Sequence, residues 1–357
     1  MSAIVLGSLL LVSCKPDNEI VRKTQIDTFY QNPTDKVDVL WVVDNSQSMF
    51  DEQTEVADKF PQFISGIEKT GLDFHIGVIN TDMASGDGRG QLIGEPSFLT
   101  PDTPDYAALF AERVKVGIDG SDREKGIDAA YTALTEPLRS GANAGFLRAG
   151  ATLSIIYVSD ENDCTDRGAL DGYPSANSCY DNASELVPVR DLIEEHEGLK
   201  SNDDRVLISA IVGPEIQQNC DGAVPGFRYQ AMAKAFGGLE ASICEASFAS
   251  IMTQLGLQAS GIMSTFQLSY DAVPETIEVY ISSTDVPGEV VELPGEDTLI
   301  WTQIPEDDTN GWRYDSEYAV LYLSGEAIPP RDTIIKVNYE IVPGSLGYGD
   351  TGDSILE

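Results

Sequence analysis

The sequence predicts an α/β fold, built on a doubly wound, mostly parallel open sheet and followed by a small all-β sandwich domain. Three observations support this prediction. The 357 residues suffice for about two domains of ordinary size. Apolar β-branched runs alternate with helical patterns over residues 36–261, which favours parallel strands joined by right-handed crossovers. Short alternating segments without helical stretches then fill residues 262–344.

Four apolar runs are expected to form the parallel sheet, because strands covered on both faces lose the polar alternation of half-exposed strands. They are residues 36–44, 74–80, 153–160 and 206–212, and the first and third end on an aspartate.

Apolar residues at helical spacing predict helices between these strands. The first helix follows the first strand through a polar turn, and Pro61 is expected to kink it. Further helices are expected over residues 124–134, 228–236 and 248–257. The glycine-rich stretch 85–90 is expected to be a turn, because its glycine spacing does not fit a dinucleotide-binding loop.

The C-terminal part reads as a small antiparallel sandwich over residues 262–344, with an acidic tail over residues 345–357. Turn clusters such as Pro294-Gly295 and Pro329-Pro330 separate its short segments. The expected strands are residues 264–270, 276–281, 298–304, 318–323 and 333–341.

The charge balance is strongly acidic. Asp and Glu number 59 against 22 Lys and Arg, which gives a formal net charge of -37. Such a surface repels phosphate backbones, so nucleic-acid binding is excluded. It either attracts cations or simply keeps the protein in solution.

The first fourteen residues contain an apolar run that is too short for a membrane-spanning helix and has the character of a secretion signal. Residues 11–14, Leu-Val-Ser-Cys, resemble the bacterial lipobox, which implies that Cys14 carries a lipid. We therefore expect a signal peptide over residues 1–14, a tether over residues 15–35, and a lipid-anchored location in the cell envelope. The alternative is a buried N-terminal strand with a core cysteine.

The other four cysteines form an even set that can pair in three ways. Pairing neighbours in sequence closes two short loops, so we predict the bridges Cys164–Cys179 and Cys220–Cys244. Residues 160–204 contain 13 acidic and three basic residues, and we expect a solvated insertion held by the first bridge. A cysteine metal site is disfavoured, because no Cys-x-x-Cys is present and only two histidines occur. Neither histidine is assigned a role.

A candidate metal site lies where the first strand turns into its helix, in Asp44-Asn45-Ser46-Gln47-Ser48. The carboxyl ends of parallel strands form the ligand crevice of an open α/β sheet, and the third strand delivers Asp160 to the same edge. Carboxylate and hydroxyl oxygens suit Mg²⁺ or Ca²⁺. The alternative role for the two aspartates is helix capping.

Over residues 36–261 the chain resembles the von Willebrand factor type A family. The resemblance implies a metal-ion-dependent adhesion site that holds Mg²⁺ or Ca²⁺ and leaves one position for an acidic side chain of a protein partner. Residue by residue, it places metal ligands at Asp44, Ser46, Ser48 and Asp160.

The family takes a further ligand, a threonine, from a second loop. Counting back from Gly126-Ile127 points to Ser121, which keeps the hydroxyl. Asp119 and Asp122 beside it either contribute to the site, as alternatives to Ser121, or are solvated carboxylates. Glu161 and Asp163 either extend the site toward a second cation or are solvated as well.

These residues support one leading hypothesis, a lipid-anchored adhesion module that captures an acidic group through its cation. A metal-dependent hydrolase is the rival, although no His-Glu-x-x-His, Gly-x-Ser-x-Gly or Walker loop supplies its machinery. A structural envelope protein with a metal-free site is the third possibility.

Overall fold

The computed structural model describes residues 23–31, 35–68, 71–84, 89–121, 123–173, 177–201, 205–216, 220, 222–295, 298–316 and 318–345. Within these residues the chain forms two compact units. The larger unit contains residues 30–264 and 328–334, and the smaller unit contains the strand before it together with residues 265–327 and the segment from 335 onward. The predicted signal peptide, Cys14 and nearly all of the acidic tail lie outside the described residues.

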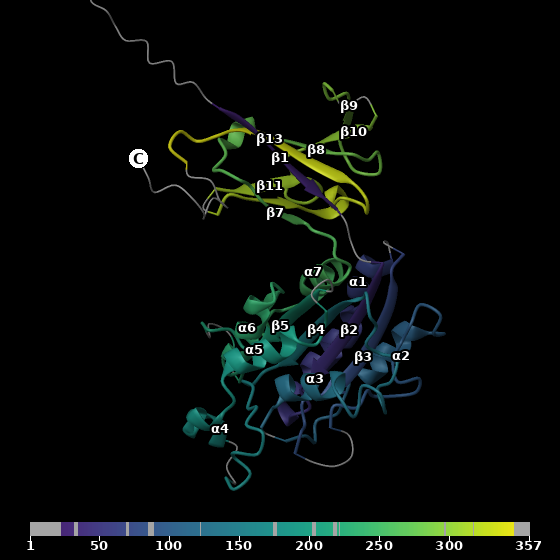
Figure 1. Ribbon diagram of the computed structural model, residues 1–357, viewed down its shortest axis with the longest axis vertical. Helices are drawn as coiled ribbons and strands as arrows, with labels where there is room; N and C mark the ends of the chain where they lie inside the picture. The colour runs from purple at the N-terminus through teal and green to yellow at the C-terminus, as the bar shows by residue number, and fades with distance from the viewer. Residues whose placement is uncertain are drawn as a thin grey trace, which may run out of the picture. The chain divides into compact units, whose positions relative to one another are not determined.

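The larger unit has the predicted parallel sheet, which contains the four expected strands, labelled in Figure 1, and a fifth, β6, that was not predicted; the order is β3-β2-β4-β5-β6. The chain runs from β2 to the edge strand β3 and then returns to the other side of β2 to build β4, β5 and β6 in turn, so the sheet is doubly wound. The strands are β2 (Lys36–Val43), β3 (Asp73–Asn80), β4 (Thr152–Ser159), β5 (Val206–Val212) and β6 (Glu240–Ser242).

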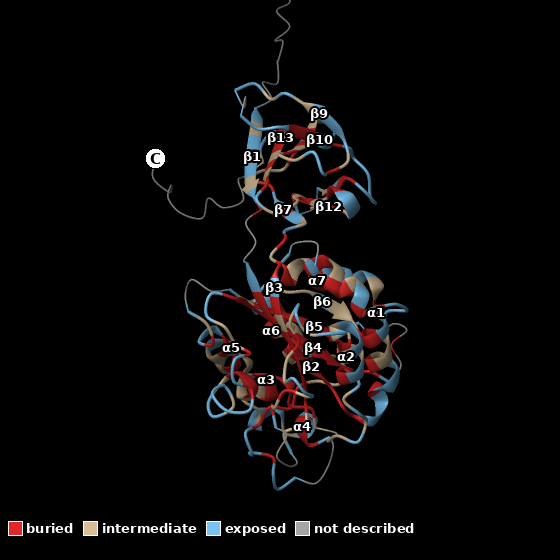
Figure 2. Ribbon diagram, turned by 90° about the vertical axis from the view of Figure 1, so that its right-hand side faces the viewer, coloured by how far each residue is buried: buried red, intermediate tan, exposed pale blue. Residues whose placement is uncertain are grey.

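Helices cover both faces of this sheet, and the buried residues concentrate on its strands (Figure 2). Successive strand side chains point to opposite faces, so Trp41 packs with one helix layer and Leu40 with the other. The first layer is α1 (Phe50–Glu68), α2 (Tyr106–Arg113) and α7 (Ala249–Ala259), and the second is α3 (Gly126–Leu134), α5 (Val189–Glu197) and α6 (Phe227–Ala235).

Two glycines allow α1 and α7 to pack closely. A Cβ atom on Gly66 would lie 2.9 Å from the Gly256 carbonyl carbon, and one on Gly256 would lie 2.1 Å from the Phe63 carbonyl oxygen. Either substitution would force the helices apart. Helix α1 continues through Pro61 to its end at Glu68.

The insertion after β4 differs from the prediction of a solvated segment. It contains the short helix α4 (Ser178–Asp181) as well as α5, and Asp163, Thr165 and Asp166 are buried in it. The acidic composition of this segment gave no sign of the burial, because the buried acids pair with basic residues from distant parts of the chain.

The smaller unit has two sheets, in the orders β1-β13-β8-β10-β9 and β11-β12-β7, around a single apolar core. The predicted all-β domain is therefore confirmed. Its strands are β1 (Thr24–Tyr30), β7 (Thr265–Gln267), β8 (Glu278–Ile281), β9 (Glu289–Val291), β10 (Trp301–Ile304), β11 (Trp312–Asp315), β12 (Val320–Leu323) and β13 (Ile334–Glu340).

The predicted tether over residues 15–35 is wrong where it overlaps β1. This edge strand buries Asp27, whose Oδ2 accepts hydrogen bonds from the Tyr339 hydroxyl at 2.8 Å and the Ser269 N–H at 2.7 Å. Phe29 packs on Phe266 with ring centroids 5.1 Å apart. The strand looked like a linker because an edge strand with one exposed face can be largely polar.

Both predicted disulfides are present. Cys164 pairs with Cys179 and Cys220 with Cys244. Among the described helices, none combines the length and apolar character that crossing a membrane requires.

His196 provides a test of the packing under α5. Burial lowers its pKa from 6.5 to about 4, and its Nδ1 lies 2.8 Å from the Leu192 carbonyl oxygen. Between pH 6.5 and 4 the unfolded chain therefore binds more protons than the folded one, so this residue removes stability as the pH falls through that window, by up to about 3 kcal/mol. His196→Phe should flatten that part of the pH dependence in urea unfolding at pH 7.5, 5.5 and 4.5. Identical pH slopes for the two proteins would contradict this expectation.

Candidate metal centre

The candidate site lies where the winding of the sheet reverses. The chain leaves β2 toward β3 but later enters β4 on the other side, so the loops after β2 and β4 diverge. Ligand crevices in open α/β sheets form at this point, outside the carboxyl ends of the strands. Asp44 directly follows β2, and Asp160 directly follows β4.

The carboxylate of Asp44 is fully buried and held in place by two hydrogen bonds. Its Oδ1 accepts the Ser46 N–H at 2.7 Å, and its Oδ2 accepts the Ser159 hydroxyl at 2.6 Å. Ser159 is the last residue of β4, so this bond links the two strands that flank the reversal point. The Asp44 N–H donates to the Val158 carbonyl at 2.9 Å and strengthens the same link.

Ser46, Ser48 and Asp160 lie around Asp44. The hydroxyl oxygens of Ser46 and Ser48 are 3.2 Å apart, and Ser48 hydrogen-bonds the carboxylate of Asp160. Asp160 is 7% exposed, and its Oδ1 has no hydrogen-bond partner among the described residues. The structure thus brings together four of the five predicted ligands.

Burial raises the pKa values of both carboxylates. Burial raises the pKa of Asp44 to about 6, and the negative charge of Asp160 adds to this rise. Burial also raises the pKa of Asp160, while the hydrogen bond from Ser48 opposes it. Two buried carboxylates with raised pKa values form an environment that a divalent cation would stabilise.

The donor set fits a hard cation of the kind that hydroxyl and carboxylate oxygens bind. In the described part of the chain, no three His, Cys, Asp or Glu side chains gather closely enough to hold an ion by themselves. Asp44 and Asp160 would therefore bind it together with the Ser46 and Ser48 hydroxyls. A cation held there would act as a Lewis acid toward an oxygen atom of a bound partner.

The loop that carries Ser121 packs against the motif. The Gly120 N–H donates to the Asn45 carbonyl at 2.8 Å. Gln53 of α1 donates to the carbonyls of both Asp44, at 2.9 Å, and Gly117, at 2.8 Å. Sequence reasoning missed this glutamine, because a polar residue on a predicted helix gives no sign of its burial.

The hydroxyl of Ser121 accepts the N–H of Arg123 at 3.1 Å, a local turn within the loop. Its role as a ligand stays a prediction. Asp122, the neighbouring alternative, lies outside the described residues.

Glu124 is a buried acid that the sequence analysis overlooked. It is 1% exposed, its Oε2 accepts a hydrogen bond from the Thr81 hydroxyl, and its Oε1 has no partner among the described residues. Burial and then the charge of Asp44 raise its pKa to about 10. The sequence feature that could have pointed to it is an acidic residue two positions before Gly126, at the start of a predicted helix.

Asp163 has a structural role that differs from both expectations for it. Its Oδ1 accepts the Ile127 N–H at 3.1 Å in the first turn of α3, and its Oδ2 accepts the Arg228 Nε–H at 3.0 Å. Asp163 is 1% exposed. It is therefore neither solvated nor directed at a second cation, because its oxygens accept hydrogen bonds from the first turn of α3 and from the partly buried guanidinium of Arg228.

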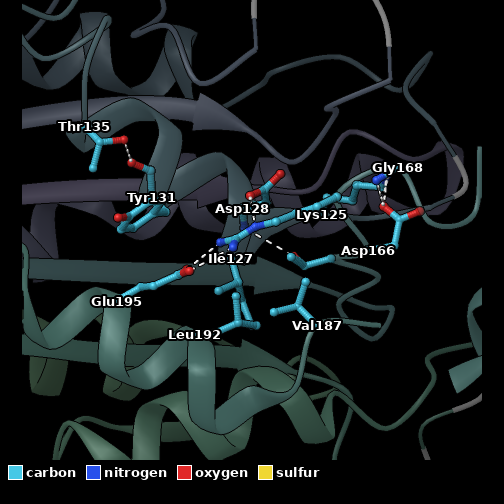
Figure 3. Close-up of polar contacts among 12 residues, drawn as sticks. Lys125, Ile127, Asp128, Tyr131, Thr135, Asp166, Gly168, Val187, Leu192 and Glu195 are labelled. Carbon is cyan, nitrogen blue, oxygen red and sulfur yellow. Dashed lines mark hydrogen bonds and ion pairs between the residues drawn. The ribbon is translucent and has the colours of Figure 1, made fainter. Parts of the chain in front are cut away.

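The basic residues around the site are committed to other acids. Lys125 pairs with Asp166 (Figure 3). Arg167 donates to Glu195 at 2.8 Å and also lies near Asp128. These contacts fix α3 and α5 against the loop after β4. They leave Lys125, the basic neighbour of Glu124 in sequence, engaged with Asp166.

Searches for related proteins gave structural matches only. No protein-family description matches the chain, and no curated protein matches it. The chain is similar to a von Willebrand factor type A structure from Catenulispora acidiphila, with 13% identity and a TM-score of 0.36, over 93% of this chain and 68% of that one.

Two pilus adhesins give similar matches. SpaC from Lactobacillus rhamnosus GG, in its open conformation, has 13% identity and a TM-score of 0.41, over 89% of this chain and 42% of that one. RrgA from Streptococcus pneumoniae has 10% identity and a TM-score of 0.34, over 89% of this chain and 58% of that one. At such values the matches support no conclusion about activity or partners.

The strand order and the placement of the motif residues are the observations that define the larger unit. The winding of the chain through the parallel sheet reverses between β2 and β4. The Asp-x-Ser-x-Ser turn follows β2, and Asp160 follows β4. The larger unit thus has the strand order and the motif placement that the resemblance to the von Willebrand factor type A family predicts.

Proposed function

We propose that the protein is an exported adhesion module whose larger unit holds a divalent cation, Mg²⁺ or Ca²⁺, and uses it to capture an acidic group on a protein partner. In this proposal Asp44, Ser46, Ser48 and Asp160 hold the ion, and the lipid on Cys14 anchors the chain in the cell envelope. The partner's carboxylate completes the coordination of the ion.

One observation carries the proposal. The hydroxyls of Ser46 and Ser48 lie 3.2 Å apart, Ser48 contacts Asp160, and the Oδ1 of Asp160 has no partner among the described residues. A buried carboxylate oxygen without a donor costs free energy unless a cation or water satisfies it. The hydroxyls beside it are the kind of oxygen that completes a hard-cation site.

Exposed aromatic side chains around the site support protein capture. Phe50 follows the Asp-x-Ser-x-Ser turn and is 63% exposed, and Phe227 begins α6 and is 51% exposed. Tyr180 is 44% exposed. Burial of its hydroxyl raises its pKa, and the negative charges of Glu161 and Asp160 add to this rise. Aromatic residues of this kind are enriched where protein partners bind.

The test combines chelation with Asp44→Ala. The divalent ion should stabilise the fold by mass action, so EDTA should lower the melting temperature of the parent protein and leave that of Asp44→Ala unchanged. Partner capture from an envelope extract should be lost both with EDTA and in Asp44→Ala. Capture by Asp307→Ala should match the parent, because Asp307 is an exposed residue of the smaller unit.

Two outcomes would reject the proposal. Equal ion-dependent stabilisation of the parent and Asp44→Ala would remove the metal site from this position. Turnover of model esters or phosphates that depends on Asp44 would favour the hydrolase hypothesis instead. The lipid anchor is tested separately, because Cys14→Ser should release the protein from membranes while its ion binding is unchanged.

A further inference from the structure

The five-stranded sheet of the smaller unit ends in an open edge. β9 is the last strand of that sheet, and in the described part of the chain only β10 pairs with it (Figure 1). Glu289 and Val290 are exposed along β9. The outer side of an edge strand presents backbone N–H and C=O groups that can pair with another chain.

Apolar side chains are exposed beside this edge. Val290 lies opposite Thr302, and Thr302 lies opposite the core residue Ile281, so Val290 is on the core-facing side of the sheet. Val290 is nevertheless 60% exposed, and Ile300, which precedes Thr302 by two residues, is 59% exposed. The opposing sheet has only three strands, and it leaves these two side chains uncovered.

A cavity of about 340 Å³ lies beside the first residue of β9. Its acidic lining is Glu278, Glu289 and Glu306, and its apolar lining includes Ile304 and Trp312. The indole of Trp312 is fixed in place, because its Nε1–H donates to the Ile304 carbonyl at 3.0 Å. The cavity thus combines three carboxylates with a rigid aromatic wall, which suits a long side chain with a positive end.

The charge around this edge is one-sided. Residues 271–312, which include β8, β9 and β10, contain 11 Asp and Glu and no Lys, Arg or His. Within the cavity, Glu278 accepts hydrogen bonds from the Tyr280 hydroxyl and the Asn338 amide, both at 3.0 Å and both from neutral donors. The edge therefore complements a basic partner, whereas a second copy of this chain, with its net charge of -37, would be repelled.

We propose that β9 binds an extended, basic segment of a protein partner by strand addition, with the partner's backbone continuing the sheet beyond β9. Successive side chains of a strand point to opposite faces. Apolar side chains of the segment would therefore cover Val290 and Ile300, while a lysine between them enters the cavity and reaches its three glutamates along Trp312. This site lies within the smaller unit and does not use the cation of the proposed function.

The probe is a capped hexapeptide of alternating lysine and valine, titrated calorimetrically into the full chain in EDTA. Glu289→Lys should weaken its binding by about tenfold or more, because a like charge then faces the lysine at both the strand and the cavity. Glu326→Lys makes the same charge change at an exposed residue of the smaller unit outside β9 and the cavity, and it should match the parent. A hexapeptide of alternating glutamate and valine should not bind.

Backbone methylation of the hexapeptide separates strand addition from attraction between charges. In an added strand only alternate backbone N–H groups face the neighbouring strand. Methylating either the valine or the lysine amides should therefore abolish binding in one case and leave it nearly unchanged in the other, although both peptides keep every charge. Hydrogen exchange of the β9 amides should also slow when the unmodified peptide is added.

Three results would overturn the proposal. Equal affinity of the parent and Glu289→Lys would place the peptide away from β9. Equal binding of the two methylated peptides would rule out strand addition. Dimerisation of the parent in sedimentation, lost in Glu289→Lys, would make a second copy the occupant of the edge. Since the titration is done in EDTA, none of these results depends on the metal site, and the failure of that site would leave this inference standing.

Discussion

Arg228→Met should destabilise the larger unit by about 3 to 5 kcal/mol, because it leaves the carboxylate of Asp163 buried without its partner. The Arg228 side chain is 12% exposed and that of Asp163 is 0% exposed, and their atoms are 3.0 Å apart. The guanidinium also donates to the Val187 carbonyl at 2.8 Å. Urea unfolding at neutral pH measures the loss.

Two further variants show whether the lost stability comes from the unpaired charge. Arg190→Met removes an arginine that is 81% exposed and pairs only at the surface, so it should change stability by less than about 1 kcal/mol. Adding Asp163→Asn to Arg228→Met should recover part of the loss, since no buried charge then stays unpaired. An Arg228→Met protein as stable as the Arg190→Met protein would show that the buried pair contributes nothing.

Replacing both Cys164 and Cys179 with serine should lower the stability of the larger unit by about 3 kcal/mol, because the bridge closes a loop over a sequence separation of 15 residues. The bridge also holds the loop after β4, whose Cys164 N–H donates to the Glu124 carbonyl at 2.6 Å. Weaker divalent-ion binding should therefore accompany the loss of stability.

Urea unfolding and calorimetric titration of the double variant measure the two effects. Asp171→Ser, an exposed substitution within the same loop, should alter stability by no more than about 0.5 kcal/mol. The contribution of the bridge would be refuted by a double variant that unfolds at the same urea concentration as the parent.

Local pattern was enough to predict the parallel sheet and the two domains. The strands β2, β4 and β5 are buried on both faces, so their sequences are continuous apolar runs that can be recognised without knowing their neighbours. The same holds for α1, whose apolar residues recur at helical spacing. The disulfide bridges were also predicted from local information, because pairing cysteines that are neighbours in the sequence closes two short loops.

Segments that bury few apolar residues gave weaker sequence patterns. Helix α5 buries only Leu192 and His196 and has no long apolar stripe. Strand β1 buries Asp27 instead of an apolar residue in its centre, so it resembled a polar linker. Both elements depend on partners far away in sequence, such as Tyr339 for Asp27.

For the candidate site, the sequence alone was enough to predict that Asp44, Ser46, Ser48 and Asp160 lie together, because each is placed by a strand end or a tight turn. The tertiary structure alone decided which acids are buried and what faces them. Asp163 is paired with Arg228, 65 residues away, while the negative charge of Asp44 acts on the buried carboxyl group of Glu124. The reason is physical: the state of a carboxylate depends on the solvent and the charges around it in space, and residues far apart in the chain supply these only after it folds.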